Sequence, residues 1–177
     1  MTHPTQIFMH RGIPVAVVDD VAIEPHGAFC AALDQTNLDD LAESLRPVFL
    51  RALPLAANRR AIFVHRTLWD IYTSGQRKAM LDHEVGHAVL GHVGCESGSD
   101  RFHMQEIQAD SYSIHGCGNS KEDMFGAIQV AIEHFINYQI TGMKALGAVS
   151  HIVQSVTIIR ENFERLHAPR LKILRAA

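Results

Sequence analysis

His83-Glu84-Val85-Gly86-His87 is the stretch of this 177-residue chain from which its fold and chemistry are best argued. On a helix, two histidines four residues apart lie one turn apart on the same face, so both imidazoles can reach one ion. The glutamate beside the first histidine is free to act on water rather than on the metal, an arrangement typical of metal-dependent hydrolysis. Five-residue motifs of this kind also arise by chance, so the surrounding sequence has to support the interpretation.

The residues on either side of the motif predict a helix of suitable length. Thr73-Ser74-Gly75-Gln76 has the T-x-x-Q form of a capping box, in which two side chains bind free backbone N–H groups at a helix start. Gly91 and Gly94 supply helix stops. We therefore expect a helix over residues 74–92, followed by a loop rich in glycine and serine and a second helix over about residues 102–115.

A catalytic zinc site needs three protein ligands and one open position, and three residues compete to be the third ligand: Glu106, His92 and His103. At 100° per residue His92 lies about 140° round the helix from His87, so we expect it to be a capping or surface histidine. Glu106 is followed four residues later, on the same helical face, by Asp110. A second carboxylate there can accept the Nδ1 hydrogen of a ligating histidine, and this favours Glu106 over His103.

The remainder of the chain predicts a small sheet before the motif and long helices after it. Of two short apolar runs, at residues 7–9 and 13–18, the second is expected as a buried strand, and the β-branched run at 61–65 is expected as the edge strand beside the site. Residues 68–72 are expected as a short helix or connecting turn. Further helices are expected over residues 38–45 (with Asn37 as cap and Pro47 as stop), 121–145 and 149–166, the last ending before Pro169. The predicted fold class is α+β with a mainly helical C-terminal half.

Composition bounds the class of protein. With 47% hydrophobic and 20% charged residues, the chain suffices for one domain with its own core. We divide it into an N-terminal part (1–55), a catalytic core (60–115) and a helical C-terminal part (120–167). A net charge of −3 argues against nucleic-acid binding. Neither a membrane span nor a secretory signal pattern is predicted, so we expect a cytoplasmic protein.

The HExxH motif followed on the next helix by Glu106-Ile107-Gln108-Ala109-Asp110 resembles the gluzincin metallopeptidases, most closely the compact minigluzincin core of the HtpX-like and ImmA/IrrE-like peptidases. The similar stretch covers about residues 60–113, and residues 165–171 loosely resemble the family's closing helix boundary. The resemblance implies a zincin-like fold with a small antiparallel or mixed sheet whose edge strand lies beside the active-site helix. It also implies Zn²⁺ as cofactor, with these roles: His83, His87 and Glu106 as ligands, Glu84 as general base, and Asp110 as the partner behind a ligand.

These features predict a zinc-dependent endopeptidase acting on peptide or protein substrates, with Glu84 as general base. His134 and Tyr138 share a face of the expected 121–145 helix and are candidates for stabilising the oxyanion, although residues of these types are commonly buried in ordinary cores. Two alternatives stay open: an ImmA-like regulatory protease specific for one cytoplasmic protein, and a non-catalytic zincin-fold binding or scaffold protein. The C-terminal helices are a candidate oligomer surface, and residues 1–54 a candidate latency segment.

Overall fold

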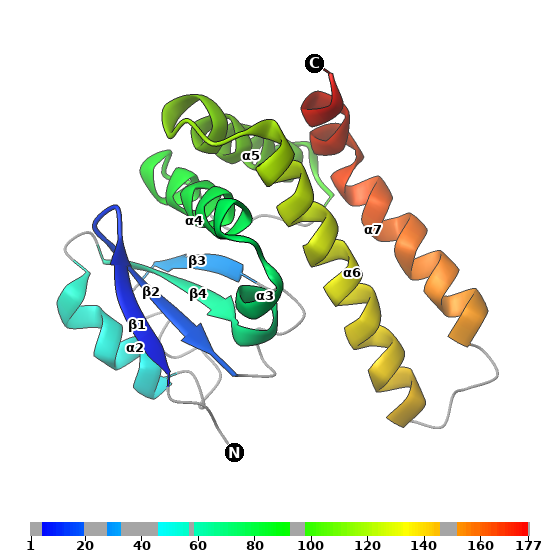
Figure 1. The fold of residues 1–177 in the computed structure, drawn as a ribbon, viewed down its shortest axis with the longest axis horizontal. Coiled ribbons are helices and arrows are strands. Elements are labelled where there is room, and N and C mark those ends of the chain that lie inside the picture. The colour runs from blue at the N-terminus through cyan, green and yellow to red at the C-terminus, as the bar shows by residue number, and fades with distance from the viewer. Residues whose placement is uncertain are drawn as a thin grey trace.

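The structure of the protein, a computed structural model, describes residues 5–19, 28–32, 46–56, 59–92, 98–145 and 152–176. Within these residues it contains a four-stranded sheet (Figure 1), whose strands in spatial order are β1 (Gln6–His10), β2 (Ile13–Val18), β4 (Arg60–His65) and β3 (Ala28–Ala32). β1 and β2 form an antiparallel hairpin, β2 and β4 are parallel, and β3 is antiparallel to β4. The predicted α+β class with a small mixed sheet is therefore confirmed.

The helices of the described ranges are α2 (Arg46–Ala52), α3 (Arg66–Ile71), α4 (Ser74–Val89), α5 (Asp100–Ser111), α6 (Lys121–Ala145) and α7 (Ile152–Arg175). The capping box is confirmed, since Thr73 and Gln76 each bind the other's backbone N–H. The observed bounds of α6 are those predicted. The helix expected over residues 38–45 lies outside the described residues, and Pro47 lies in the first turn of α2, where the missing N–H has no helical partner to lose.

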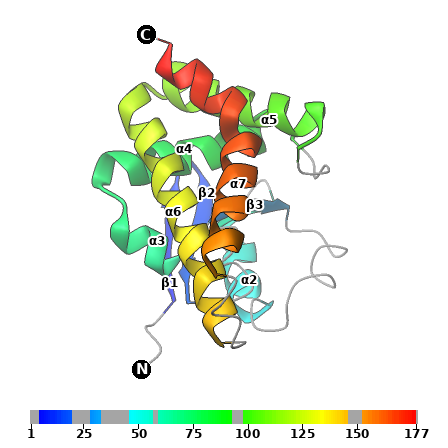
Figure 2. The ribbon, with the colours of Figure 1, turned by 90° about the vertical axis from the view of Figure 1, so that its right-hand side faces the viewer.

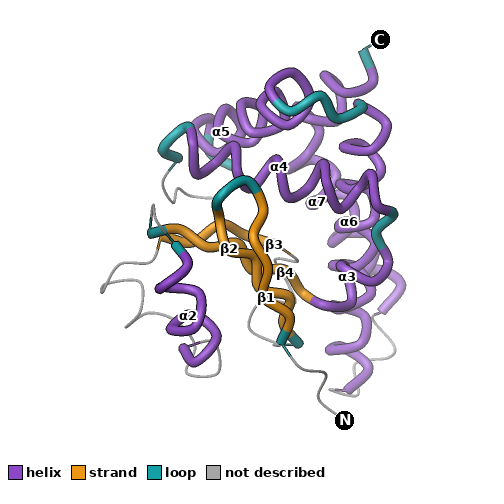
Figure 3. The backbone as a smooth tube through the Cα atoms, turned by 60° about the vertical axis from the view of Figure 1, so that its left-hand side comes forward, coloured by secondary structure: helices purple, strands orange, loops and turns teal. Residues whose placement is uncertain are grey.

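The sheet is covered on both faces by helices (Figure 3). Side chains alternate between the faces of a strand, and in β4 Ile62 and Val64 join the main core under α4 and α6, while Ala61 and Phe63 join a smaller core against α2. A strand buried on both faces carries a continuous apolar run. The continuous apolar run over residues 61–65 therefore indicates a strand in the centre of the sheet.

The prediction that residues 61–65 form the edge strand beside the site is wrong. β4 lies between β2 and β3, and the strand at the edge of the sheet next to α4 is β3. β3 has the sequence Ala28-Phe29-Cys30-Ala31-Ala32, whose alanines have little intrinsic preference for a strand. Its formation depends on pairing with β4, which local sequence does not reveal.

The predicted end of the last helix is also wrong. α7 continues through Pro169 to Arg175 and packs beside α6 (Figure 2). A proline inside a helix costs about 3 kcal/mol because one hydrogen bond is lost and its ring crowds the preceding turn. Beyond this proline, however, Leu171 and Leu174 are buried in the main core, and Arg170 is buried as well. Tertiary packing therefore outweighs the local stop signal. None of the helices in the described ranges has both the length and the apolar character needed to cross a bilayer.

The buried carboxylate of Asp82 fixes α4 against distant parts of the chain. It accepts hydrogen bonds from His10 and Arg11 at the β1–β2 turn, from Lys78 one turn earlier, and from Asn119 in the loop before α6. The Asp82 side chain has no exposed surface. These bonds to Asp82, together with packing on the sheet, therefore fix the orientation of α4 and of its histidines.

Candidate metal centre

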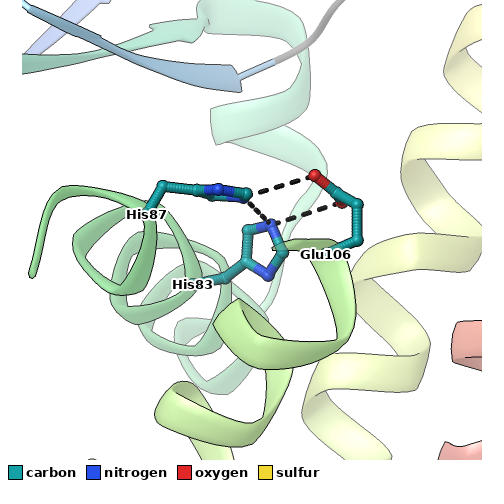
Figure 4. Close-up of side chains that lie close together, drawn as sticks. All are labelled: His83, His87 and Glu106. Atoms are coloured by element: carbon teal, nitrogen blue, oxygen red, sulfur yellow. Dashed lines mark hydrogen bonds and ion pairs between the residues drawn. The ribbon is translucent and has the colours of Figure 1, made fainter. Parts of the chain in front are cut away.

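Three side chains from α4 and α5 converge on one point (Figure 4). The Nε2 atoms of His83 and His87 lie 3.0 Å apart, and the two oxygens of Glu106 lie 3.6 Å from His83 Nε2 and 3.3 Å from His87 Nε2. Ligands at about 2.0 Å from a tetrahedral zinc ion are separated by about 3.3 Å, so this triangle has the right size. The donor set, two imidazole nitrogens and one carboxylate, fits zinc, and these residues form a candidate metal group.

Local structure explains the convergence. His83 and His87 lie one turn apart on α4, as their spacing predicted, and Glu106 reaches them from α5. The two helices approach closely at Gly86, where an added Cβ would lie only 3.1 Å from the Ala109 Cα. A glycine within the motif therefore sets the distance between the two histidines and the third donor.

Asp110 lies directly behind His83. Its Oδ1 is 2.8 Å from His83 Nδ1, and both side chains are buried. Because the carboxylate can only accept, His83 donates from Nδ1 and keeps its Nε2 lone pair for a metal. The structure thus brings Asp110 to the position that the sequence argument gave it.

Arg170 is a component of the site that the sequence argument missed. Its Nε and Nη2 donate to the two Asp110 oxygens, each at 2.8 Å, and its Nη1 donates to Glu106. Burial raises the pKa of Asp110, but the charge of Arg170 together with the hydrogen bonds from His83 and Arg170 outweighs burial and holds that pKa at about 2. Burial also raises the pKa of Glu106, but the charge of Arg170 together with the contacts to His87 and His83 holds that pKa well below its ordinary value. Both carboxylates are therefore ionised at neutral pH.

His167, one turn before Arg170, is a second neighbour that was not predicted. Its Nδ1 lies 3.3 Å from Arg170 Nη1, and burial together with the Arg170 charge lowers the pKa of His167 to about 4. It is therefore a neutral imidazole beside the metal group. Residues 165–171 had been singled out in the sequence, but the expectation that the helix ends before Pro169 gave His167 no position near the site.

The two residues proposed for the oxyanion lie on α6. His134 packs against His65, with ring centroids 5.6 Å apart, at the end of β4. Tyr138 lies one turn further along α6. Neither belongs to the metal group found among the described residues.

Glu84 is buried in α4 immediately after the first histidine. Burial raises the pKa of the Cys30 thiol to about 12, and the negative charge of Glu84 adds to this. The same two causes raise the pKa of Tyr72. The charge of Glu84 therefore acts both on Cys30 in β3 and on Tyr72 after α3.

His92 is closer to the site than a continuous helix would allow. α4 ends at Val89, and Gly91, with φ +67°, reverses the chain. His92 Nδ1 consequently lies 2.9 Å from His87 Nδ1. The 140° argument assumed a helix through residue 92 and is wrong for that reason, although His92 is not a member of the metal group, and neither is His103 on α5.

The chain was compared with known proteins at the levels of family, sequence and structure. No family model, curated protein or solved structure matched this chain. An interpretation of its chemistry therefore depends on the motif and on the geometry of these side chains.

Proposed function

We propose that this protein is a zinc-dependent endopeptidase of the gluzincin type. The observation that carries the proposal is the convergence of His83 Nε2 and His87 Nε2, 3.0 Å apart, with the two Glu106 oxygens, one 3.3 Å from His87 Nε2 and the other 3.6 Å from His83 Nε2. Glu84 follows His83 directly on α4 and is not a member of this group, which leaves its carboxylate available for proton transfer.

In this proposal His83, His87 and Glu106 would hold a zinc ion, which would supply a Lewis acid for the substrate carbonyl and would lower the pKa of water. Glu84 takes the proton from the attacking water and later donates it to the leaving amine. Its burial keeps bulk water from competing for that proton. Asp110 holds the His83 ring in place, so that this ligand costs no reorganisation when metal binds.

The substrate is an extended peptide that pairs with β3. Among the described residues β3 pairs with β4 on one side only, and a strand edge of this kind can add a further strand through main-chain hydrogen bonds. A substrate in that position would lie next to α4, which contacts β3. His167 is the better candidate for the oxyanion than His134 or Tyr138, because it is a neutral imidazole whose Nδ1 lies 3.3 Å from Arg170 Nη1, the atom that donates to Glu106.

Zinc content and peptidase activity of the wild type, Glu84→Gln and Glu106→Ala together test the proposal. Glu84→Gln should keep stoichiometric zinc and lose about 100-fold or more in turnover, because only proton transfer is impaired. Glu106→Ala should lose zinc. Stoichiometric zinc in Glu106→Ala would remove that residue from the ligand set.

The substrates should include casein and a library of peptides drawn from a whole proteome, because a protease dedicated to one protein is silent on generic substrates. Cleavage that disappears on chelation and returns with zinc supports an enzyme. Zinc-loaded protein that cleaves nothing in either set would favour the non-catalytic scaffold instead.

A further inference from the structure

Both nitrogens of the His87 ring are engaged. Nε2 faces the metal centre, 3.0 Å from His83 Nε2, and Nδ1 lies 2.9 Å from His92 Nδ1. The other edge of the His92 ring is also held, since its Nε2 lies 3.0 Å from Oε1 of Gln108 on α5. A chain of contacts therefore runs from the metal centre through two imidazoles to the helix that carries Glu106.

The end of α4 is built to bring His92 into this chain. The backbone N–H of His92 donates to the His87 carbonyl at 3.0 Å, and that of Gly91 donates to the Ala88 carbonyl at 3.4 Å. This pair of bonds, with Gly91 at positive φ, is the Schellman ending of a helix. It folds the chain back over the last turn, so that the side chain of His92 lies over that of His87.

The number of protons on each ring determines which group donates in each of these contacts. A neutral imidazole has one N–H, and Gln108 Oε1 can only accept, so the proton of His92 lies on Nε2 and its Nδ1 accepts. His87 then donates from Nδ1 to His92, in competition with the Glu106 oxygen 3.3 Å from its Nε2, and the lone pair of Nε2 faces the centre. His83 shows the same polarity, because it donates from Nδ1 to Asp110.

We propose that His92, anchored by Gln108, is a positioning residue that fixes the proton of His87 on Nδ1 and thereby presents Nε2 to the metal. This rests on the proposed function in that it takes the metal centre as given. His92 does for His87 what Asp110 does for His83, but with a neutral partner in place of a charged one. Partners of this kind typically change metal affinity by about 10- to 100-fold.

The test compares His92→Phe, which keeps a ring without nitrogens, with His92→Asn, whose side-chain oxygen restores an acceptor near the place of Nδ1. Zinc dissociation constants are measured by competition with a chromophoric chelator. His92→Phe should bind zinc about 10-fold or more weakly, and His92→Asn should recover most of the loss. Gln108→Leu should give a smaller loss, since it removes only the anchor. His103→Phe, a histidine of α5 outside the metal group, is the matched control and should bind as the wild type does.

A second readout does not need metal. Long-range ¹H–¹⁵N spectra of the zinc-free protein report which nitrogen of His87 carries the proton. The expected result is Nδ1–H in the wild type and in His92→Asn, and a mixture of tautomers in His92→Phe. A His92→Phe protein that binds zinc as tightly as the wild type, or a His92→Asn protein as weak as His92→Phe, would overturn the proposal.

The two proposals fail in different ways. If the wild-type protein binds no zinc, the proposed function is contradicted. The tautomer of His87 in the zinc-free protein still tests the role of His92. A wild type that binds zinc but cleaves no peptide leaves the affinity comparison valid. Thermal unfolding of the zinc-free variants shows whether each one folds.

Discussion

Arg170 determines whether the residues of the metal centre can be buried at all. Glu106 and Asp110 are both ionised, and burying two carboxylates without a counter-charge is costly. Arg170, itself buried, donates to both of them. A bound zinc ion would share the charge of Glu106 with this guanidinium, so Arg170 should matter most when the metal is absent.

Replacing Arg170 with methionine is therefore expected to destabilise the zinc-free protein by about 3–5 kcal/mol, the usual consequence of leaving buried charges without their partner. Added zinc should narrow the difference from the wild type, because the ion supplies positive charge to the same carboxylates. Arg160→Met is the matched control on α7: Arg160 pairs with Glu133 at the surface, where solvent screens the interaction, and little change is expected. Urea denaturation with and without zinc measures the effect, and equal stability of Arg170→Met and the wild type without zinc would contradict it.

At the scale of elements, the distance between α4 and α5 sets the size of the candidate metal centre. An added Cβ at Gly86 would meet backbone atoms of Ala109 at 3.1 and 3.2 Å, and backbone cannot move aside as a side-chain end can. At Gly126 in α6 an added Cβ would instead meet the end of the flexible Gln76 side chain. The same change of glycine to alanine therefore meets backbone atoms at Gly86 and the end of a side chain at Gly126.

Gly86→Ala is expected to push α5 away and weaken zinc binding, by about 10-fold if Glu106 shifts by a few tenths of an ångström, since ligand geometry is held to such tolerances. The melting temperature should change less, because alanine favours a helix over glycine by about 1 kcal/mol and offsets part of the crowding. Gly126→Ala presses on Gln76, whose side chain caps the start of α4, so it should lower the melting temperature and yet leave zinc affinity unchanged, because Gln76 lies about two turns from His83. Chelator competition and thermal unfolding check the pair, and an unweakened Gly86→Ala would show that α5 does not need this close approach.

The elements that the sequence predicted are those encoded locally. Thr73 and Gln76 begin α4, and the spacing of His83 and His87 places two ligands on one face without knowledge of the fold. Glu106 and Asp110 were found in the same way, four residues apart on one helix. The errors concern long-range packing: β3 depends on β4, α7 passes Pro169 because Leu171 and Leu174 are buried, and Arg170 reaches Asp110 across 60 residues of chain. For His92 the local sequence did hold the information. A helix stop at Gly91 means that the angle of 100° per residue no longer applies to residue 92.

For the whole molecule, the first part of the chain is a constituent of the fold. Residues 1–54 supply β1, β2 and β3, and β2 is buried along its entire length. Arg11 and His10 also hold Asp82 and hence α4. Removal of this part should therefore unfold the protein, and a latency segment that can be cut away without loss of fold is not supported.

Acid stability is the property in which these distant connections act together. Asp82 ties α4 to the β1–β2 turn and to the loop before α6, while Glu106 and Asp110 tie α5 to α4 and α7. Burial alone would raise the pKa of each carboxylate, but its partners together outweigh burial. At Asp82 these are the hydrogen bonds from His10, Arg11, Asn119 and Lys78, and at Glu106 and Asp110 they are the charge of Arg170 and the contacts with the site histidines. All three pKa values lie below the ordinary range, that of Asp110 at about 2. The folded state therefore holds fewer protons than the unfolded state in acid.

Since the unfolded carboxylates titrate at about pH 4 and the folded ones lower, this stabilisation is fully present above about pH 5 and is lost as the pH falls through about 4 towards 2. The free energy of unfolding of the zinc-free protein should decline over this range, each carboxylate contributing at most about 1.4 kcal/mol per pH unit. Asp82→Asn should lower the slope by one such contribution, whereas Asp19→Asn, at an exposed pair with Arg66, should leave it unchanged. Urea titrations at a series of pH values measure the slopes, and parallel curves for Asp82→Asn and the wild type would mean that Asp82 does not link stability to pH.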